Sequence, residues 1–150
     1  MDKNSIVKSW YDFAKDDLIT AKFLLGLHPL KLEIICYHCQ QSAEKILKGF
    51  LIDKNIDPPK TQDLRLLRRM CGEIADGFDD IEEACVRLTA YGVQPRYPME
   101  IELTESDMRQ AISDADHIMN FISQRLELSS DEGLTGSLRC QRKESIPTIN

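Results

Sequence analysis

The sequence predicts an all-α protein, an antiparallel up-and-down bundle of about four long helices plus one short helix. Apolar residues recur at alternating steps of three and four along most of the chain, which is the period of an amphipathic helix. Only seven glycines and six prolines occur in 150 residues, and most stand between the periodic segments. No segment shows the strict alternation of a convincing strand.

The first helix is expected at about Ser5–Leu27, because its apolar residues form one stripe: Val7, Trp10, Ala14, Leu18, Ala21 and Leu25. The segment Gly26–Lys31 contains both Gly and Pro and interrupts this pattern. The second helix is expected at about Leu32–Lys54, and it ends at Asn55, ahead of two consecutive prolines.

A third, shorter helix is expected after Lys60–Leu64, with Thr61 as its N-cap and Asp63 in its first turn. Its apolar row is Leu64, Leu67, Cys71 and Ile74, and it stops near Gly77. The fourth helix is expected at about Asp79–Tyr91, with an apolar row formed by Ile81, Ala84, Cys85, Leu88 and Tyr91.

The last helix is expected to begin at Thr104, where Thr104 and Asp107 resemble a capping box with Asp in the usual Glu position. Its stripe is the clearest in the chain: Met108, Ala111, Ile112, Ala115, Ile118, Met119, Ile122 and Leu126. Residues 129–150 have no apolar period and mixed charge. The predicted organisation is therefore one helical domain over residues 1–128 and an irregular C-terminal tail over residues 129–150.

The composition is that of a single soluble globular domain, with 42% hydrophobic and 29% charged residues. No apolar run approaches membrane-spanning length, and the first residues do not resemble an export signal. Five cysteines without such a signal favour free thiols in a cytoplasmic protein. The formal net charge of −6 argues against non-specific coating of nucleic acid, which needs a dense basic surface.

The C-x-x-C pair Cys36 and Cys39, with His38 between them, looks like a metal or redox site. At about 100° per residue, both cysteines fall in the apolar stripe of the second helix and His38 falls on the other side. Two thiols that point into the bundle and an imidazole that points away from it cannot ligate one tetrahedral ion, and a redox C-x-x-C stands at the start of a helix after a strand. We therefore expect the two cysteines to be core residues.

Gln40 falls within the same apolar sector. If it is buried, its amide needs hydrogen-bond partners, either a second copy across a two-fold axis or a polar group of another helix. A position at the solvent rim is the alternative.

Three motifs in order resemble the HEPN domain family of small helical proteins: YHCQQSAEKILKGFL from Tyr37, KTQDL from Lys60, and LTAYGVQPRYP ending at Pro98. The resemblance covers about Ile6 to Leu126. It implies an antiparallel helical bundle that pairs into a homodimer. It also implies a role tied to nucleotides or RNA, often beside a partner nucleotidyltransferase in toxin–antitoxin-like modules.

Some members of that family are metal-independent ribonucleases, which carry an Arg, a polar residue and then a His after four to six intervening positions. Here no histidine follows Arg96 before Leu103, and the other histidines lack an arginine at that spacing. Cleavage of RNA by acid–base catalysis needs such a group near neutral pKa. The sequence therefore predicts no catalytic residue, no metal ligand and no cofactor, and a ribonuclease with an unorthodox base or a pure protein-interaction module remain the alternatives.

The candidate ligand-binding residues are Arg96, Tyr97, Lys60, Lys45 and Tyr91. Pro95 and Pro98 stiffen the loop that carries Arg96. A guanidinium and nearby ammonium groups suit a phosphate, and a tyrosine ring suits a base. The structural alternative is that Arg96 pairs with Glu44 or Asp63 and ties the loop to the bundle.

Two further features are expected to be surface ones. Arg65, Arg68 and Arg69 form a basic run on the third helix, which is usually a solvated face and otherwise a docking site for an acidic partner or an RNA backbone. His117 lies on the polar side of the last helix.

Overall fold

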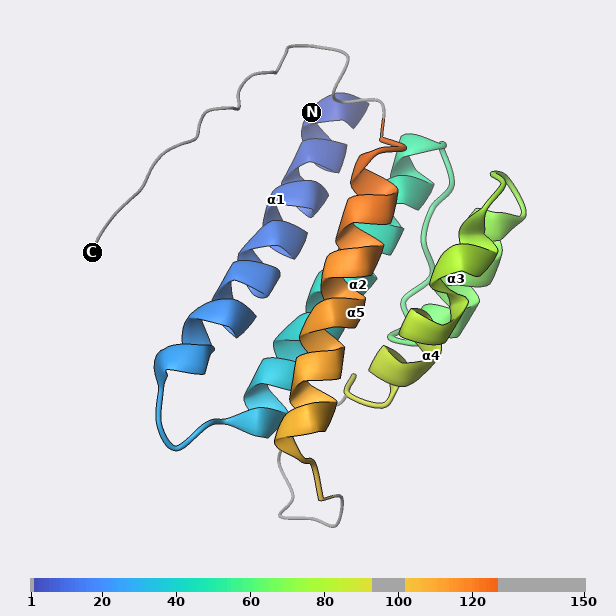
Figure 1. Cartoon of the computed structure of the whole chain (residues 1–150). Coiled ribbons are helices and arrows are strands. Elements are labelled where there is room, and N and C mark those ends of the chain that lie inside the picture. Colours follow the sequence, from blue (N-terminus) through green and yellow to red (C-terminus); the bar gives the residue numbers. More distant parts are fainter. Residues whose placement is uncertain (1, 93–101, 127–150) are drawn as a thin grey trace.

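A computed structural model describes residues 2–92 and 102–126 (Figure 1). These ranges hold five α-helices and two short 3₁₀ helices and no strand: α1 (Lys3–Phe23), η1 (Leu24–Gly26), α2 (Leu32–Asp53), α3 (Leu64–Gly72), η2 (Phe78–Ile81), α4 (Glu82–Thr89) and α5 (Glu105–Ser123). The predicted all-α class is confirmed. Three of the helices are long, and the fourth predicted helix is divided between η2 and the eight-residue α4.

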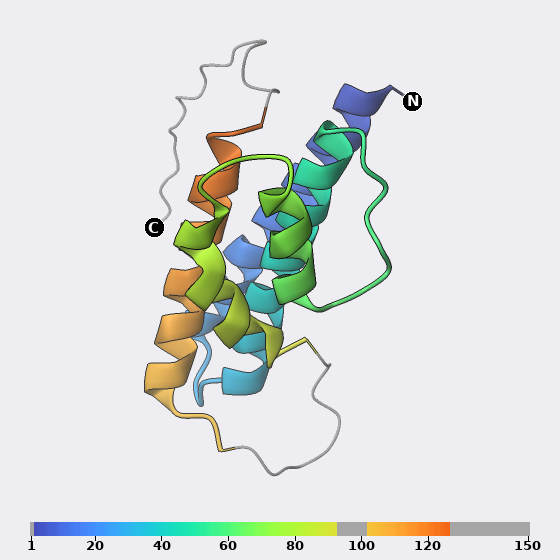
Figure 2. The ribbon, with the colours of Figure 1, turned by 90° about the vertical axis from the view of Figure 1, so that its right-hand side faces the viewer.

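The helices alternate in direction with one exception (Figure 1). α1 and α2 are antiparallel, and α4 is antiparallel to both α3 and α5. The connection 54–63 runs back along α2 before α3 begins, which differs from a simple up-and-down order (Figure 2). As a result, α2, α3 and α5 share one direction (Figure 2). The thiol of Cys71, in the last turn of α3, lies 3.9 Å from the carbonyl oxygen of Leu47 in α2.

Close backbone approach joins α1 to α2. The hydroxyl of Ser42 donates a hydrogen bond to the carbonyl of Ala14 at 2.8 Å. A side-chain carbon added at Gly49 would lie 3.0 Å from Cβ of Trp10, so this position needs glycine for packing. Small residues on the facing sides therefore allow α1 to lie directly on α2.

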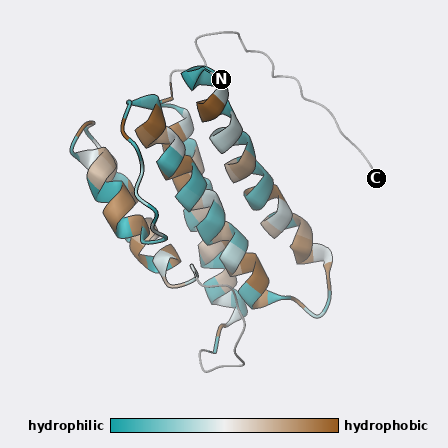
Figure 3. Cartoon of the chain, turned by 180° about the vertical axis from the view of Figure 1, so that it is seen from behind, coloured by the Kyte–Doolittle hydropathy of each residue, from teal (hydrophilic) through white to brown (hydrophobic). Residues whose placement is uncertain are grey.

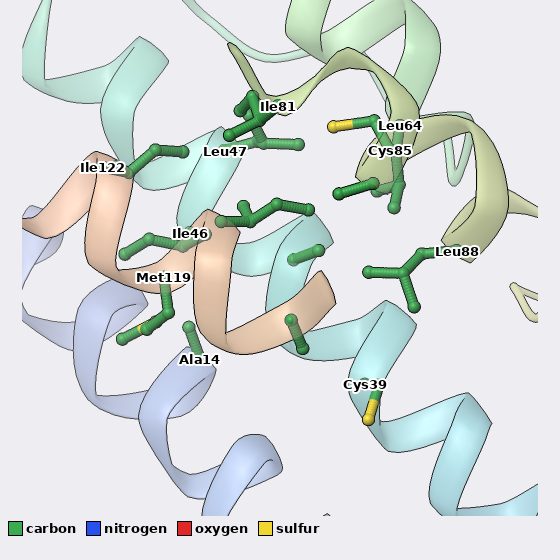
Figure 4. Close-up of a cluster of buried hydrophobic side chains, with 14 of the residues drawn as sticks. Ala14, Cys39, Ile46, Leu47, Leu64, Ile81, Cys85, Leu88, Met119 and Ile122 are labelled. Carbon is green, nitrogen blue, oxygen red and sulfur yellow. The ribbon is translucent and has the colours of Figure 1, made fainter. Parts of the chain in front are cut away.

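The core lies between α2, α5 and the α3–α4 pair, and side chains from all the helices meet in it (Figure 4). Phe78, from the short η2 helix, is buried between Phe50 of α2 and Phe121 of α5, with ring centroids 5.1 and 5.0 Å away. The left-handed backbone of Gly77, with φ of 91°, turns the chain into η2 and so delivers Phe78 to this position. The α3–α4 corner is thereby anchored to both long helices.

The predicted helix starts are partly confirmed. Thr104 and Asp107 form the expected capping box at the start of α5. At α3, however, Asp63 is the N-cap and accepts from the backbone of Arg65, whereas Thr61 accepts from the backbone of Asp63 just before the helix. The prediction of Thr61 as the cap was wrong because Asp63 still has an extended backbone, so the helix begins only after it.

Ile74 was expected in the buried row of the third helix and is instead 43% exposed. The prediction failed because α3 ends at Gly72, and Ile74 no longer follows the helical period.

The predicted boundary at 128 and the tail 129–150 lie outside the described residues. No helix within the described ranges is long and apolar enough to cross a membrane.

Candidate functional site

Both cysteines of the C-x-x-C pair are core residues, as predicted. Cys36 and Cys39 are fully buried, and Figure 4 shows Cys39 among the apolar side chains. Burial raises the pKa of the Cys36 thiol from 9.0 to about 12 and raises that of Cys39 as well. His38 instead faces α1, where its Nδ1 lies 2.9 Å from Oδ1 of Asp17. Cys36 and Cys39 therefore pack as small hydrophobic groups, apart from the imidazole.

Gln40 is fully buried, which decides between the two alternatives that the sequence left open. Its Nε2 donates to the carbonyl of Gln62 at 3.0 Å, and its Oε1 accepts from Nε2 of Gln41 at 2.9 Å. A side-chain carbon added at Gly92 would lie 3.2 Å from Nε2 of Gln40 and 3.4 Å from Oε1 of Gln62. Gln40 thus ties the connection 54–63 to the point where the chain leaves α4.

Tyr91 lies beside a cavity of about 190 Å³ between α4 and α5. The cavity is lined by Arg87, Tyr91, Asp107, Gln110, Ala111 and Asp114. Burial, together with the negative charges of Asp107 and Asp114, raises the pKa of the Tyr91 hydroxyl to about 12. The hydroxyl therefore stays protonated and able to donate a hydrogen bond.

Two of the lining residues, Arg87 and Asp114, form an ion pair. Arg87 donates from Nε and Nη2 to the two oxygens of Asp114, both at 2.9 Å, and Gln110 donates to Oδ1 of Asp114 at 3.0 Å. The Asp114 carboxylate raises the pKa of the Arg87 guanidinium. Because Asp114 is buried and neutralised by Arg87, the carboxylate of Asp107 leaves the lining with a net negative charge.

The predicted site residues are distributed over two sides of α2. Lys60 is exposed, two residues before Gln62, and so belongs to the end of the bundle where Tyr91 and Gly92 lie. Lys45 is bound to α1, with Nζ 2.6 Å from Oδ2 of Asp17. Lys45 stands five positions after Gln40, which corresponds to about 140° around α2. Lys45 therefore does not converge with Lys60 and Tyr91.

Arg96 and Tyr97 lie outside the described residues. The two acids that the sequence offered as partners for Arg96 have other partners: Glu44 pairs with Lys48 at 2.8 Å, and Asp63 pairs with Arg65 at 3.0 Å. The segment that carries Arg96 is flanked on one side by Tyr91 and Gly92 and on the other by the capping box of α5. Both flanks reach the cavity, through Tyr91 and Asp107.

The basic run on α3 is a largely solvated face. Arg65 is exposed and pairs with Asp63, which raises its pKa, and Arg69 is exposed. Arg68 is the exception, because its side chain is only 13% exposed and its Nη1 reaches Oδ1 of Asp79 at 3.4 Å and the carbonyl of Phe78 at 3.5 Å. His117 is an exposed histidine, as expected, with Nε2 3.1 Å from Oδ2 of Asp80.

Among the buried or nearly buried acids that the sequence did not predict, Asp17 and Asp114 bind groups on a second helix. Asp17 joins His38 and Lys45 across α1 and α2, and nothing in its local sequence separates it from Asp16. The burial of Asp114, in contrast, could have been predicted from the sequence. Asp114 lies about 40° from Ile118 on a helical wheel of α5, at the edge of the apolar stripe. A charge at such an edge requires a partner, but the identity of that partner, Arg87, depends on how α4 packs.

Comparisons with known proteins agree with this architecture. The family model described as "HEPN domain" matches residues 7–126. The structure is similar to the crystal structure of TT1696 from Thermus thermophilus, with a TM-score of 0.72 and 25% identity over 80% of this chain and 98% of that chain. It is also similar to ST0689, named as an archaeal HEPN homologue, with a TM-score of 0.64 and 25% identity over 79% of this chain and 96% of that one. No functionally curated protein matches the sequence. The chain belongs to the HEPN domain family.

Proposed function

We propose that this protein is a non-catalytic HEPN domain that binds a nucleotide or an RNA end at the end of the bundle where Tyr91 and Asp107, on the two flanks of the Arg96 segment, line one cavity. The observation that carries this proposal is the cavity between α4 and α5, which is lined from both flanks of the Arg96 segment by Tyr91 and Asp107. The connection that carries Lys60 reaches the same end through the Gln40–Gln62 hydrogen bond.

The charges of the predicted site residues suit two different parts of a nucleotide, the base and the phosphate. The cavity lining is acidic and offers acceptors at Asp107, so it suits the N–H groups of a base rather than a phosphate. The phosphate is assigned to Arg96 and Lys60, which supply a guanidinium fork and an ammonium group. Purines with an exocyclic amine or a ring N–H, guanine above all, are therefore the preferred bases.

The test is thermal unfolding with guanosine and adenosine nucleotides and with inorganic phosphate alone. At a nucleotide concentration about 100 times Kd we expect Tm to rise by about 5–10 °C. Arg96→Ala should abolish the shift, while Arg69→Ala, at an exposed arginine of α3, should retain it. The absence of a shift with every nucleotide, or an equal loss in both variants, contradicts nucleotide binding.

The same preparations incubated with labelled RNA and a chelator test the non-catalytic part of the proposal. We expect no cleavage, because His38 and His117 are bound to Asp17 and Asp80 on other parts of the bundle. The α1–α2 connection, which contains His28, lies at the same end of the bundle as the end of α4 and the start of α5 (Figure 1). Cleavage that is lost in Arg96→Ala and in His28→Ala overturns the non-catalytic assignment.

We further propose that the chain forms a homodimer through the outer face of α1. In a toxin–antitoxin-like module, a partner nucleotidyltransferase would bind to this same face in place of the second copy. Figure 3 shows hydrophobic residues along α1 down to its connection with α2. Five of the seven large exposed hydrophobic residues of the described ranges lie on α1, this connection or the first turn of α2: Phe13, Ile19, Phe23, Leu27 and Ile34. Such a concentration of exposed apolar side chains is typical of a protein interface.

Sedimentation of the purified chain tests the dimer. We expect Phe13→Ser with Phe23→Ser to weaken dimerisation about 30-fold or more, since truncating an aromatic side chain at the centre of an interface costs about 1 kcal/mol or more, or about fivefold in Kd, for each residue. The matched control is Ile74→Ser with Val86→Ser, the two large exposed hydrophobic residues that lie elsewhere in the described ranges. A monomer in the unmodified protein, or an equal effect of both pairs, contradicts the α1 interface.

A further inference from the structure

The corner between α3 and α4 is unusually acidic. Residues 73–83 contain six carboxylates and no lysine or arginine: Glu73, Asp76, Asp79, Asp80, Glu82 and Glu83. All six are exposed. We name residues 73–83 the acidic corner.

Neighbouring cations neutralise only part of the acidic corner. Arg68 reaches Asp79 at 3.4 Å, Arg87 reaches Glu83 at 3.7 Å, and His117 reaches Asp80 at 3.1 Å. The Nε and Nη2 groups of Arg87 are already bound to Asp114. Within the described ranges, the other three acids of the corner form no ion pair, so the corner keeps a surplus of negative charge: Glu73, Asp76 and Glu82.

The acidic corner also has a fixed shape and an apolar margin. Gly77 sets the turn, and Phe78 anchors it between the rings of Phe50 and Phe121. Ile74 and Val86 are 43% and 47% exposed beside the carboxylates. A preorganised surface with carboxylates around exposed apolar groups is complementary to a segment that carries both cations and an apolar side chain.

The C-terminal sequence of the chain itself contains such a segment. Leu138–Lys143 has three cations and one leucine, with no acid before Glu144. The described part of α5 leads to the corner, since a side-chain carbon added at Gly77 would lie 3.6 Å from Nη2 of Arg125. Figure 2 shows the α3–α4 connection beside the end of α5 from which the C-terminal segment continues.

The distance along the chain permits the contact. A chain of eleven residues, the length of 127–137, spans at most about 36–40 Å, and the average span of a random coil of that length is about 17–20 Å. A linker of this length gives an effective concentration on the order of millimolar. Weak charge pairing at the acidic corner is therefore favoured within one molecule.

We propose that Leu138–Lys143 docks on the acidic corner of its own chain, with its arginines and lysine against the unpaired carboxylates and Leu138 against Ile74 and Val86. This contact is separate from the nucleotide site and does not depend on it. Docking of this segment regulates access to the acidic corner. A basic partner competes with the segment for the corner, and an acidic partner competes with the corner for the segment.

Cys140 allows a direct test with the full chain. The other four cysteines are buried, so a nitroxide label reacts at Cys140, inside the cationic segment. We expect the label to broaden the amide signals of residues 73–86 selectively, and about 0.5 M salt to abolish the broadening. Arg139→Glu with Arg142→Glu and Lys143→Glu should remove it without any change in the folded bundle.

Matched charge variants complete the test. Glu73→Lys with Asp76→Lys and Glu82→Lys should remove the broadening, whereas Asp16→Lys with Glu33→Lys and Glu102→Lys, at exposed acids elsewhere, should retain it. Equal loss in both triple variants, or no broadening of residues 73–86 at all, overturns the proposal. If the amide signals of residues 73–86 broaden only in an unlabelled molecule mixed with a labelled one, the segment of a second copy occupies the corner. That result overturns docking within one chain.

Discussion

Above about pH 9 the native protein is expected to lose stability steeply, because four thiols are buried in its core. Cys36, Cys39, Cys71 and Cys85 are all fully buried. Burial raises the pKa of Cys36, Cys71 and Cys85 from 9.0 to about 12 and raises that of Cys39 too. In the unfolded chain these thiols ionise near their ordinary pKa, whereas in the native protein they remain protonated.

The sign follows from proton binding. Between pH 9 and 12 the native state holds thiol protons that the unfolded state has released, so the free energy of unfolding falls as pH rises. Each thiol contributes about 1.4 kcal/mol per pH unit, and four contribute roughly 5 kcal/mol per pH unit. Since small domains have about 5–15 kcal/mol in total, we expect unfolding between about pH 10 and 11.

Urea unfolding followed by circular dichroism from about pH 7 to about pH 10.5 measures this slope. Cys85→Ala should reduce the slope of the free energy of unfolding against pH by about 1.4 kcal/mol per pH unit. This change in slope is independent of any stability that the variant loses at neutral pH. Val86→Ala, at the adjacent exposed position, should leave the slope unchanged. A slope in Cys85→Ala equal to that of the unmodified protein would show that this thiol already ionises in the folded state.

Replacing Phe78 is expected to have the next largest effect. Phe78→Ala should lower the free energy of unfolding by about 3–5 kcal/mol, the usual cost of removing a buried aromatic ring. The side chain is 2% exposed and contacts Phe50 and Phe121 on two different helices. Its loss leaves a cavity and also releases the α3–α4 corner from the long helices.

Phe23→Ala is the matched control for Phe78→Ala. Phe23 is 81% exposed at the end of α1, so its replacement should change the free energy of unfolding by less than about 0.5 kcal/mol. Urea unfolding of the two variants at neutral pH, at concentrations where the chain is monomeric, gives the comparison. Similar costs for the two replacements would contradict the anchoring role of Phe78.

The helices themselves could be predicted from the sequence because their signals are local. The apolar period of three and four marks the buried side of each helix, and Thr104 with Asp107 marks the start of α5. The same period showed that Cys36 and Cys39 are core residues, without knowledge of any neighbouring helix. Predictions failed where helix ends mattered, as at Thr61 and Ile74, because an end depends on the backbone of one or two residues.

The site could be predicted only in part. The sequence placed Lys45 on the polar side of the second helix, but only the packing of α1 on α2 binds it to Asp17 and directs it away from Tyr91. Gln40 was recognised as a candidate buried amide, yet its partner at Gln62 depends on the path of the connection 54–63. The roles predicted for Arg96 and Tyr97 stay predictions.

By itself the sequence determined which residues form helices, which side of each helix is buried, and which family motifs the chain carries. Only the tertiary structure decided which charges meet: Asp17 with His38 and Lys45, and Asp114 with Arg87. It also left three carboxylates of the acidic corner without an ion pair among the residues that the structure describes. The physical reason is distance. A helical period is set by residues three or four positions apart, whereas an ion pair between helices depends on how whole elements pack and turn.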